Sequence, residues 1–130
     1  MKYVNKRIAI DIDGTLTKLK KLERFDWDYL INLEPDEEML KLVNELYEEN
    51  TIYIHTGRQH KFKQITKIWL DKIGIKYHYL VMDKLTAEVY IDDRSIHPEV
   101  FKLRNQLDES TNKIFELMHK GRELSMEIGW

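Results

Sequence analysis

Apolar positions along the first hundred residues alternate between a pattern typical of strands and one typical of helices. Short apolar runs closed by turn residues predict buried strands, whereas apolar residues three and four apart predict amphipathic helices. We therefore expect strands over 7–12, 51–55, 77–82 and 88–91. One helix is expected to begin near Pro35 and continue through Leu46, and a second to include Phe62 and stop near Gly74. Residues 18–35 are expected to be irregular.

Strands that alternate with helices predict βαβ units, and hence a Rossmann-like three-layer α/β sandwich with a mainly parallel sheet. In such sheets the ligand site lies beyond the carboxyl ends of the strands. Five polar residues fall at the predicted strand ends, namely Asp11, Asp13, Thr56, Asp92 and Asp93. We expect them to converge on one edge of the sheet, although they come from distant parts of the chain.

The composition of the 130-residue chain narrows the class of protein. This length suggests one domain, and the 42% of hydrophobic residues are enough for a core. The net charge of −2 gives no general basic field for nucleic acid, and the lack of cysteine excludes disulfides and thiolate metal sites. No signal peptide and no membrane span are recognisable, so a soluble cytoplasmic protein is expected.

Two aspartates one residue apart, Asp11 and Asp13, follow the first predicted strand and precede Gly14 and Thr15. An unpaired buried carboxylate costs free energy, and a hard divalent cation such as Mg²⁺ is a suitable partner. The alternative is a surface turn in which Asp13 and Gly14 only reverse the chain. The other polar residues at strand ends favour the metal site.

The residue types of this set match the needs of phosphoryl transfer. A carboxylate can attack phosphorus, and a second one two residues on can act as general acid and then general base. A hydroxyl (Thr56) and a lysine (Lys84) can bind the phosphoryl oxygens that carry charge in the transition state. Further carboxylates, Asp92 and Asp93, can complete a magnesium site.

These motifs resemble those of the haloacid dehalogenase (HAD) superfamily, in particular its small phosphatases. The first motif is residues 11–16, Asp-Ile-Asp-Gly-Thr-Leu; Thr56, Lys84 and residues 91–93 fit the other three. The resemblance implies that Asp11 is the nucleophile and a Mg²⁺ ligand. It implies that Asp13 is the general acid/base and binds Mg²⁺ through its backbone carbonyl, and an aspartate at this position favours phosphatase chemistry.

The resemblance further implies that Thr56 and Lys84 hold the phosphoryl group, and that Asp92 or Asp93 binds Mg²⁺. The choice between these two aspartates stays open. Lys72 and Lys76 also precede the fourth motif, and Lys84 is preferred because it directly follows the third predicted strand.

Gly57 and Arg58, which follow Thr56, are candidate substrate-binding residues. Arg58 could contact substrate anions, and the alternative is a surface arginine at a helix start. The loop after the first motif carries a basic run and then an aromatic cluster, namely Lys18, Lys20, Lys21, Arg24, Phe25, Trp27 and Tyr29. The run suits either an anionic substrate or solvent, and the cluster either packs the loop or stacks on a base or sugar.

Larger HAD proteins carry a cap domain over the site, and this chain has no room for one. Only 21 residues separate Thr15 from Glu37, and 27 separate Thr56 from Lys84. We therefore expect a capless catalytic core over residues 1–98 with an open cleft.

Pro98 is expected to start a helix, and residues 99–130 are expected to form a C-terminal helical segment. Its seam positions follow steps of four and three, at Leu103, Leu107, Ser110, Ile114, Leu117, Gly121, Leu124 and Ile128. This pattern fits a helix that packs on its own core, and equally one that joins subunits into a homo-oligomer.

Taken together, these features predict a magnesium-dependent phosphatase that hydrolyses a phosphate monoester through an aspartyl-phosphate. A small phosphorylated metabolite, such as a sugar phosphate or nucleotide, is the favoured substrate, and a phosphorylated nucleic acid end stays open. The alternatives are a phosphoacceptor signalling domain of the receiver type and a non-catalytic interaction module.

Overall fold

The computed structural model describes residues 2–127, with side chains described through residue 120. The described residues fall into two compact units, 2–93 and 94–127. The expected division into a core and a helical segment after residue 98 stays a prediction. No described helix is long and apolar enough to cross a membrane.

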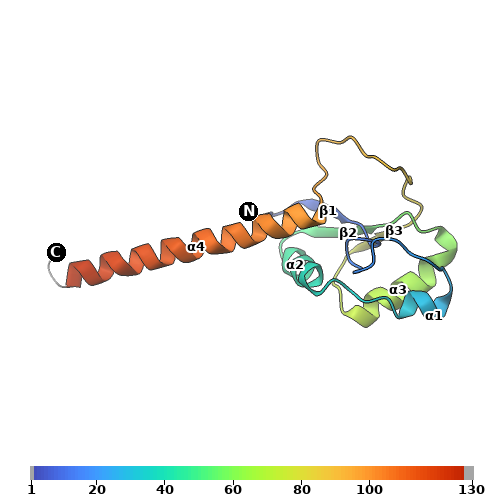
Figure 1. The fold of residues 1–130 in the computed structure, drawn as a ribbon, viewed down its shortest axis with the longest axis horizontal. Helices are drawn as coiled ribbons and strands as arrows, with labels where there is room; N and C mark the ends of the chain where they lie inside the picture. Colours follow the sequence, from blue (N-terminus) through green and yellow to red (C-terminus); the bar gives the residue numbers. More distant parts are fainter. Residues whose placement is uncertain (1, 128–130) are drawn as a thin grey trace. The chain divides into compact units, whose positions relative to one another are not determined.

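Three parallel strands form the sheet of the first unit, in the order β1-β2-β3 (Figure 1). They span Arg7–Ile10, Thr51–His55 and Tyr79–Val81, so β1 and β3 are shorter than expected. Ile8 pairs with Ile52, and Ile54 pairs with Leu80, which aligns the apolar positions of neighbouring strands. The predicted α/β architecture with a parallel sheet is confirmed, and the carboxyl ends of the strands share one edge.

Short helices connect these strands, namely α1 over Trp27–Ile31, α2 over Glu37–Tyr47, the 3-10 helix η1 over His60–Phe62 and α3 over Lys63–Ile73. The Asp36 carboxylate accepts a hydrogen bond from the Met39 amide at 3.0 Å, which caps α2 where its start was predicted. Gly74 ends α3 with a φ of 77°, a left-handed conformation that suits glycine.

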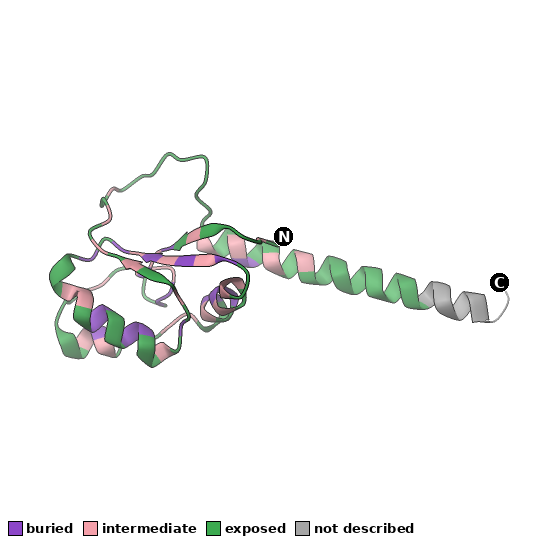
Figure 2. Ribbon diagram, turned by 180° about the vertical axis from the view of Figure 1, so that it is seen from behind, coloured by how far each residue is buried: buried purple, intermediate pink, exposed green. Residues whose placement is uncertain are grey.

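The core of this unit lies between the sheet and the helices α2 and α3, which cover the same face (Figures 1 and 2). Its fully buried side chains include Ile12, Leu16, Ile52, Ile54, Ile65, Trp69 and Leu70. The Trp69 indole N–H donates to the Leu33 carbonyl at 2.9 Å. This bond fixes the loop after β1 to α3, so the segment that carries the first motif is tied to the core.

Two expectations about local structure are wrong. Residues 88–91 form no strand, and Ile91 is 98% exposed. Apolar alternation alone does not make a strand, because its backbone needs a hydrogen-bonded neighbour, and β1 pairs only with β2 among the described residues. Residues 18–35 contain the helix α1, which is too short to show a helical period in the sequence and is capped by Asp26.

The connections between the strands confirm the absence of a cap domain. Within the described residues, the segment 11–36 contains only α1, and the segment 56–78 contains only η1 and α3. The edge that carries the strand ends is therefore not covered by an inserted domain of this chain.

The second unit is built around α4, a helix over Pro98–Glu127, which confirms the predicted helix start. Its seam residues Leu103, Leu107, Ile114 and Leu117 are 57–65% exposed. Among the other seam positions, the side chains at 121 and 124 and the whole of residue 128 lie outside the described part of the chain. The described part of the seam is thus an apolar stripe on a charged helix.

Candidate active site

The first motif forms a tight turn directly after β1. The Ile12 carbonyl accepts hydrogen bonds from three successive amides, those of Thr15, Leu16 and Thr17, at 3.0, 2.8 and 3.1 Å. Ile12 itself is fully buried. The partly buried Asp11 and Asp13 therefore flank a side chain that is fixed in the core, and the turn holds their backbone in place.

Gly14 completes this turn and lets the following loop approach closely. Its φ is 85°, which a residue with a side chain rarely adopts, and its amide donates to the Thr17 hydroxyl at 3.0 Å. A Cβ at this position would lie 3.4 Å from the Lys20 carbonyl oxygen. The basic run of the loop therefore passes directly beside the first motif.

Thr56 lies buried at the end of β2, where it continues the sheet. Its amide donates to the Val81 carbonyl at 2.9 Å, and its carbonyl accepts from the Lys84 amide at 2.9 Å. Its hydroxyl accepts a hydrogen bond from the Arg58 amide at 3.2 Å. The second and third motifs are thus joined by backbone bonds, although 27 residues separate them.

Arg58 is buried and forms a two-pronged ion pair with Asp13. Its Nε lies 3.0 Å from Asp13 Oδ2 and its Nη2 lies 2.7 Å from Asp13 Oδ1. Its Nη1 donates to the Thr66 hydroxyl on α3 at 3.1 Å. This burial contradicts the surface alternative for Arg58 and gives it a partner that no sequence signal indicated. A contact with substrate stays a prediction, since all three guanidinium nitrogens already have partners.

Several neighbouring groups shift the pKa of the Asp11 carboxyl. Burial raises the pKa of the Asp11 carboxyl above its ordinary value, and the Asp13 carboxylate adds to this rise. The hydrogen bond from the Ile12 amide and the charges of Lys84 and His55 lower the pKa and partly offset it. Burial and the Lys84 charge also lower the pKa of His55, which favours its neutral form.

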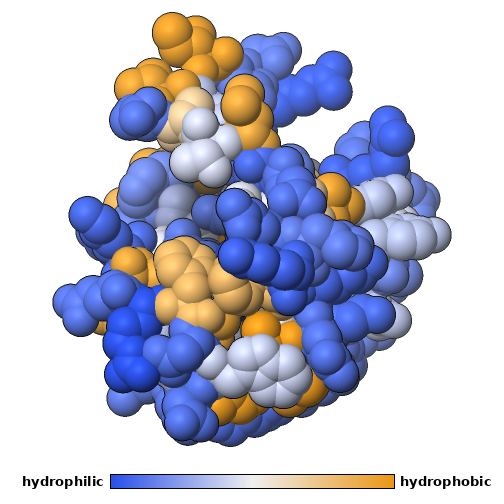
Figure 3. All heavy atoms as spheres, turned by 90° about the vertical axis from the view of Figure 1, so that its right-hand side faces the viewer, coloured by the Kyte–Doolittle hydropathy of each residue, from blue (hydrophilic) through white to orange (hydrophobic). Residues whose placement is uncertain are grey.

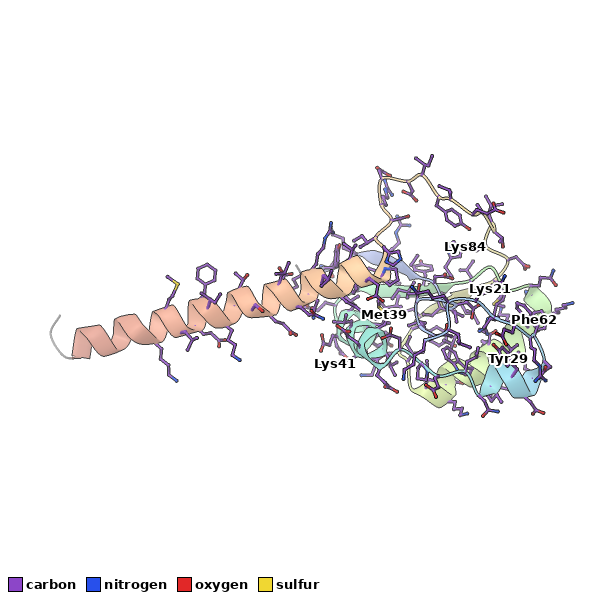
Figure 4. The ribbon with its side chains drawn as sticks, viewed as in Figure 1. Lys21, Tyr29, Met39, Lys41, Phe62 and Lys84 are labelled. Carbon is purple, nitrogen blue, oxygen red and sulfur yellow. The ribbon has the colours of Figure 1, made fainter. Side chains whose placement is uncertain are left out.

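The three candidate lysines differ in their contacts. Lys72 Nζ donates to the Ile31 carbonyl at 2.9 Å, and Lys76 Nζ pairs with Glu48 at 3.1 Å. The charge of Lys84 lowers the pKa of Asp11, and Lys84 lies at the end of the sheet where the motifs meet (Figure 4). The geometry therefore favours Lys84 as the lysine of the site.

Gly57 allows the segment after β3 to pack against the second motif. A Cβ on Gly57 would lie 3.1 Å from the Thr86 hydroxyl and 3.6 Å from the Lys84 carbonyl. Lys84 Nζ also lies 4.9 Å from the centre of the Tyr90 ring. Sequence reasoning missed Thr86 and Tyr90, because only the folded loop brings them to this edge.

Asp92 and Asp93 are exposed on the segment 82–97, which has no helix or strand. Among the described residues, no three His, Asp or Glu side chains form a group that could hold a metal ion. The site near Asp11 and Asp13 still suits Mg²⁺, which commonly binds one or two carboxylates together with water and phosphate oxygens. The assignment of Asp92 and Asp93 as further ligands stays a prediction.

Solved structures support this description of the fold. An MCSG target protein from Vibrio cholerae is 26% identical, with a TM-score of 0.62 over 75% of this chain and 87% of that one. A chain of the Pnkp1/Rnl/Hen1 RNA repair complex is 18% identical with a TM-score of 0.53, covering 82% of this chain and 32% of that one. A chain of a second Pnkp1/Rnl/Hen1 complex is 23% identical with a TM-score of 0.51, covering 75% and 34%.

No curated protein sequence matches the chain. The family model described as the polynucleotide kinase PNKP phosphatase domain matches residues 5–110, which include the first three motifs, Asp92 and Asp93. The chain therefore belongs to this phosphatase-domain family, within the HAD superfamily that its motifs resemble.

Proposed function

We propose that the protein is a magnesium-dependent phosphatase that removes the phosphate from a polynucleotide end through an aspartyl-phosphate on Asp11. The proposal is supported by three groups that lie at one edge of the sheet. They are the partly buried Asp11 carboxyl, Lys84, whose charge lowers the pKa of Asp11, and Asp13, which Arg58 holds through two hydrogen bonds. This arrangement supplies a nucleophile, a group that binds phosphoryl oxygens and an oriented acid/base.

In the first step, a carboxylate oxygen of Asp11 attacks phosphorus and the bond between phosphorus and the ester oxygen breaks. Asp13 donates a proton to the departing oxygen, which leaves as an alcohol. In the second step, Asp13 accepts a proton from water, the water oxygen attacks phosphorus, and Asp11 is released with inorganic phosphate. Asp13 therefore enters the first step as the carboxylic acid, is the carboxylate between the two steps, and regains its proton from the water. The Arg58 contacts orient the Asp13 carboxyl group for this exchange.

Thr56 and Lys84 bind the phosphoryl oxygens in this scheme and stabilise their charge in the transition state. Asp11 and the Asp13 carbonyl would hold Mg²⁺, with Asp92 or Asp93 as further ligands. When bound, the cation offsets the repulsion between the carboxylate and the phosphate.

A polynucleotide end is preferred over a sugar phosphate for three reasons. The family to which the chain belongs is named for the phosphatase domain of polynucleotide kinase. Two proteins of similar fold belong to Pnkp1/Rnl/Hen1 complexes, one of which is described as an RNA repair complex. The absence of an inserted cap domain also leaves room for a long substrate.

Release of inorganic phosphate tests this function and its rivals. The substrates are oligonucleotides with a 3′- or 5′-phosphate, a sugar phosphate and p-nitrophenyl phosphate, each with Mg²⁺ and with chelator. We expect release from an oligonucleotide only with Mg²⁺, and a loss of about 10³-fold or more in Asp11→Asn. Asp71→Asn, an exposed carboxylate on α3, is the matched control.

The outcomes separate the alternatives. Stable phosphorylation without turnover would support a receiver-like phosphoacceptor, and no reaction with any substrate would support an interaction module. Full activity in excess chelator would overturn the magnesium requirement.

Self-association through α4 is part of the proposal, because its exposed apolar stripe is suited to another helix. Burial of each such side chain contributes about 1.5–3 kcal/mol, so Leu107→Glu with Leu117→Glu should shift an oligomer toward monomer. Lys113→Glu, an exposed site on the same helix, is the control. Light scattering measures the state, and a wild-type monomer at tens of micromolar (an order-of-magnitude working concentration) would contradict this part.

A further inference from the structure

Two loops that leave the carboxyl edge of the sheet meet through their aromatic rings. The loop after β1 carries Phe25, and η1, which follows the second motif, carries Phe62. The ring centres lie 5.4 Å apart with 39° between their planes. An aromatic contact therefore joins the loop that follows the first motif to the segment that follows Thr56 and Arg58.

This contact leaves much aromatic surface in solvent. Phe25 is 48% exposed, and its contact partner Phe62 is half-buried. Trp27, two residues after Phe25, is 52% exposed. Figure 3 looks onto this side of the molecule, where apolar side chains in orange lie among hydrophilic ones in blue. The exposed part of these rings is a flat apolar surface that is available to a ligand.

The loop that presents the rings is fixed in shape. The Asp26 carboxylate, between Phe25 and Trp27, accepts the Tyr29 amide at 3.0 Å and pairs with the side chain of Arg24. The Tyr29 hydroxyl accepts the Glu23 amide at 3.3 Å. Because these hydrogen bonds already order the loop, little conformational entropy is lost when a flat ligand binds to its rings.

The part of this loop that lies next to the first motif carries positive charge. Lys20 packs its backbone against Gly14, and Lys20 and Lys21 are both exposed. Lys21 and Lys84 lie at the same end of the sheet (Figure 4). On the far side of the aromatic contact, Lys61 Nζ lies 5.2 Å from the Phe62 ring centre. The acidic residues Glu23, Asp26 and Asp28 follow these lysines. The positive charge is therefore confined to the part of the loop nearer the first motif.

We infer that Phe25 and Phe62 form a platform on which a base of a single-stranded nucleic acid stacks, while Lys20 and Lys21 bind its backbone phosphate. This inference rests on the proposed function and names how that substrate is held. Lys20 and Lys21 precede Phe25 on the same loop. Aromatic rings that stack on bases, combined with positive charge that binds the backbone, are typical of sites for single-stranded nucleic acid. A sugar phosphate has no flat ring to cover the exposed faces.

The test compares Phe25→Ala with wild type on a short single-stranded oligonucleotide with a terminal phosphate and on p-nitrophenyl phosphate. Loss of a base–aromatic stack should lower kcat/KM for the oligonucleotide about 10- to 100-fold and leave p-nitrophenyl phosphate hydrolysis unchanged. Phe25→Trp should retain activity on both. Ile68→Ala, a partly exposed apolar residue on α3, is the control and should change neither.

A second substrate makes the test independent of folding. An oligonucleotide whose terminal nucleotide lacks its base should be a poorer substrate for wild type by the same factor, and should be handled equally by wild type and Phe25→Ala. Lys20→Gln with Lys21→Gln should reduce the salt dependence of oligonucleotide hydrolysis, whereas Lys41→Gln, away from this end on α2, should not (Figure 4).

Equal losses of Phe25→Ala on both phosphorylated substrates would overturn the platform, and so would an unchanged rate on the oligonucleotide. If wild type hydrolyses p-nitrophenyl phosphate but no oligonucleotide, the polynucleotide substrate itself is wrong and the platform falls with it. If wild type hydrolyses the oligonucleotide with no effect of Phe25 or of the missing base, only the platform is wrong.

Discussion

The edge formed by β1 and β2 and the segment 82–97 both carry predicted catalytic residues, yet they are built in opposite ways. At the strand edge, Thr56 and Arg58 are buried and Asp13 is held by two hydrogen bonds. In the segment after β3, residues 88–97 are exposed and have no regular structure. The half of the candidate site that follows β1 and β2 is thus fixed by the core, whereas the half with Asp92 and Asp93 is not.

This difference indicates that the two halves serve separate tasks. Groups that hold and attack a phosphoryl group need a fixed geometry before the substrate arrives. Carboxylates that complete a metal site can be ordered by the cation, because binding free energy supplies the ordering. We therefore expect substitutions in the first half to change stability and activity together, and substitutions in the second half to change the response to Mg²⁺ alone.

The largest effect should come from Arg58→Ala, which leaves Asp13 without its partner and removes a bond to Thr66. Loss of one member of a buried pair costs about 3–5 kcal/mol, and the exposure of Asp13 places this case near the lower value. Urea unfolding measures the change, and phosphatase activity should fall with it. Arg24→Ala, which breaks the exposed pair with Asp26, is the control. Equal stability of the two variants would refute the structural role of Arg58.

A smaller and different effect is expected for Asp92→Asn combined with Asp93→Asn. Because both residues are exposed, the thermal unfolding midpoint of the metal-free protein should stay the same or rise slightly. The Mg²⁺ concentration for half-maximal activity should rise about tenfold or more, as expected when metal ligands or their supporting groups are lost. An unchanged Mg²⁺ requirement would show that neither aspartate contributes to the metal site.

The smallest effect concerns the pH dependence of stability in chelator. The pKa of Asp11 is raised in the folded state, so the folded protein binds its proton more tightly than the unfolded chain does. Stability relative to Asp11→Asn is therefore greatest below the ordinary aspartate pKa and is lost as pH rises through the raised value. Asp11→Asn should thus unfold at a higher temperature than wild type at pH 7, and the gap should close as pH falls below the ordinary aspartate pKa of 3.8. A gap that widens toward low pH would contradict the raised pKa.

The sequence predicted the features that depend on local residue patterns and missed those that depend on contacts between distant segments. The strand β2 was predicted with its observed boundaries, and the start of α2 was expected near Pro35, close to the observed start at Glu37, because local residue patterns determine both. The strand expected at 88–91 failed, because alternation in the sequence cannot supply the hydrogen-bonded neighbour that a strand requires. Arg58 was recognised as a candidate, but its bond to Asp13 depends on how β1 and β2 pair, which no local pattern encodes.

The ion pair between Arg58 and Asp13 also bears on how the enzyme forms during folding. The turn after β1 closes through bonds between residues three to five apart, whereas this pair joins residues 45 apart in the sequence. Local contacts form early at little entropic cost, and distant ones wait for the chain to close a long loop. A chain with a finished first motif can therefore still lack an oriented Asp13. Under the proposed mechanism, recovery of phosphatase activity during refolding should then report the pairing of β1 with β2 rather than the local turn.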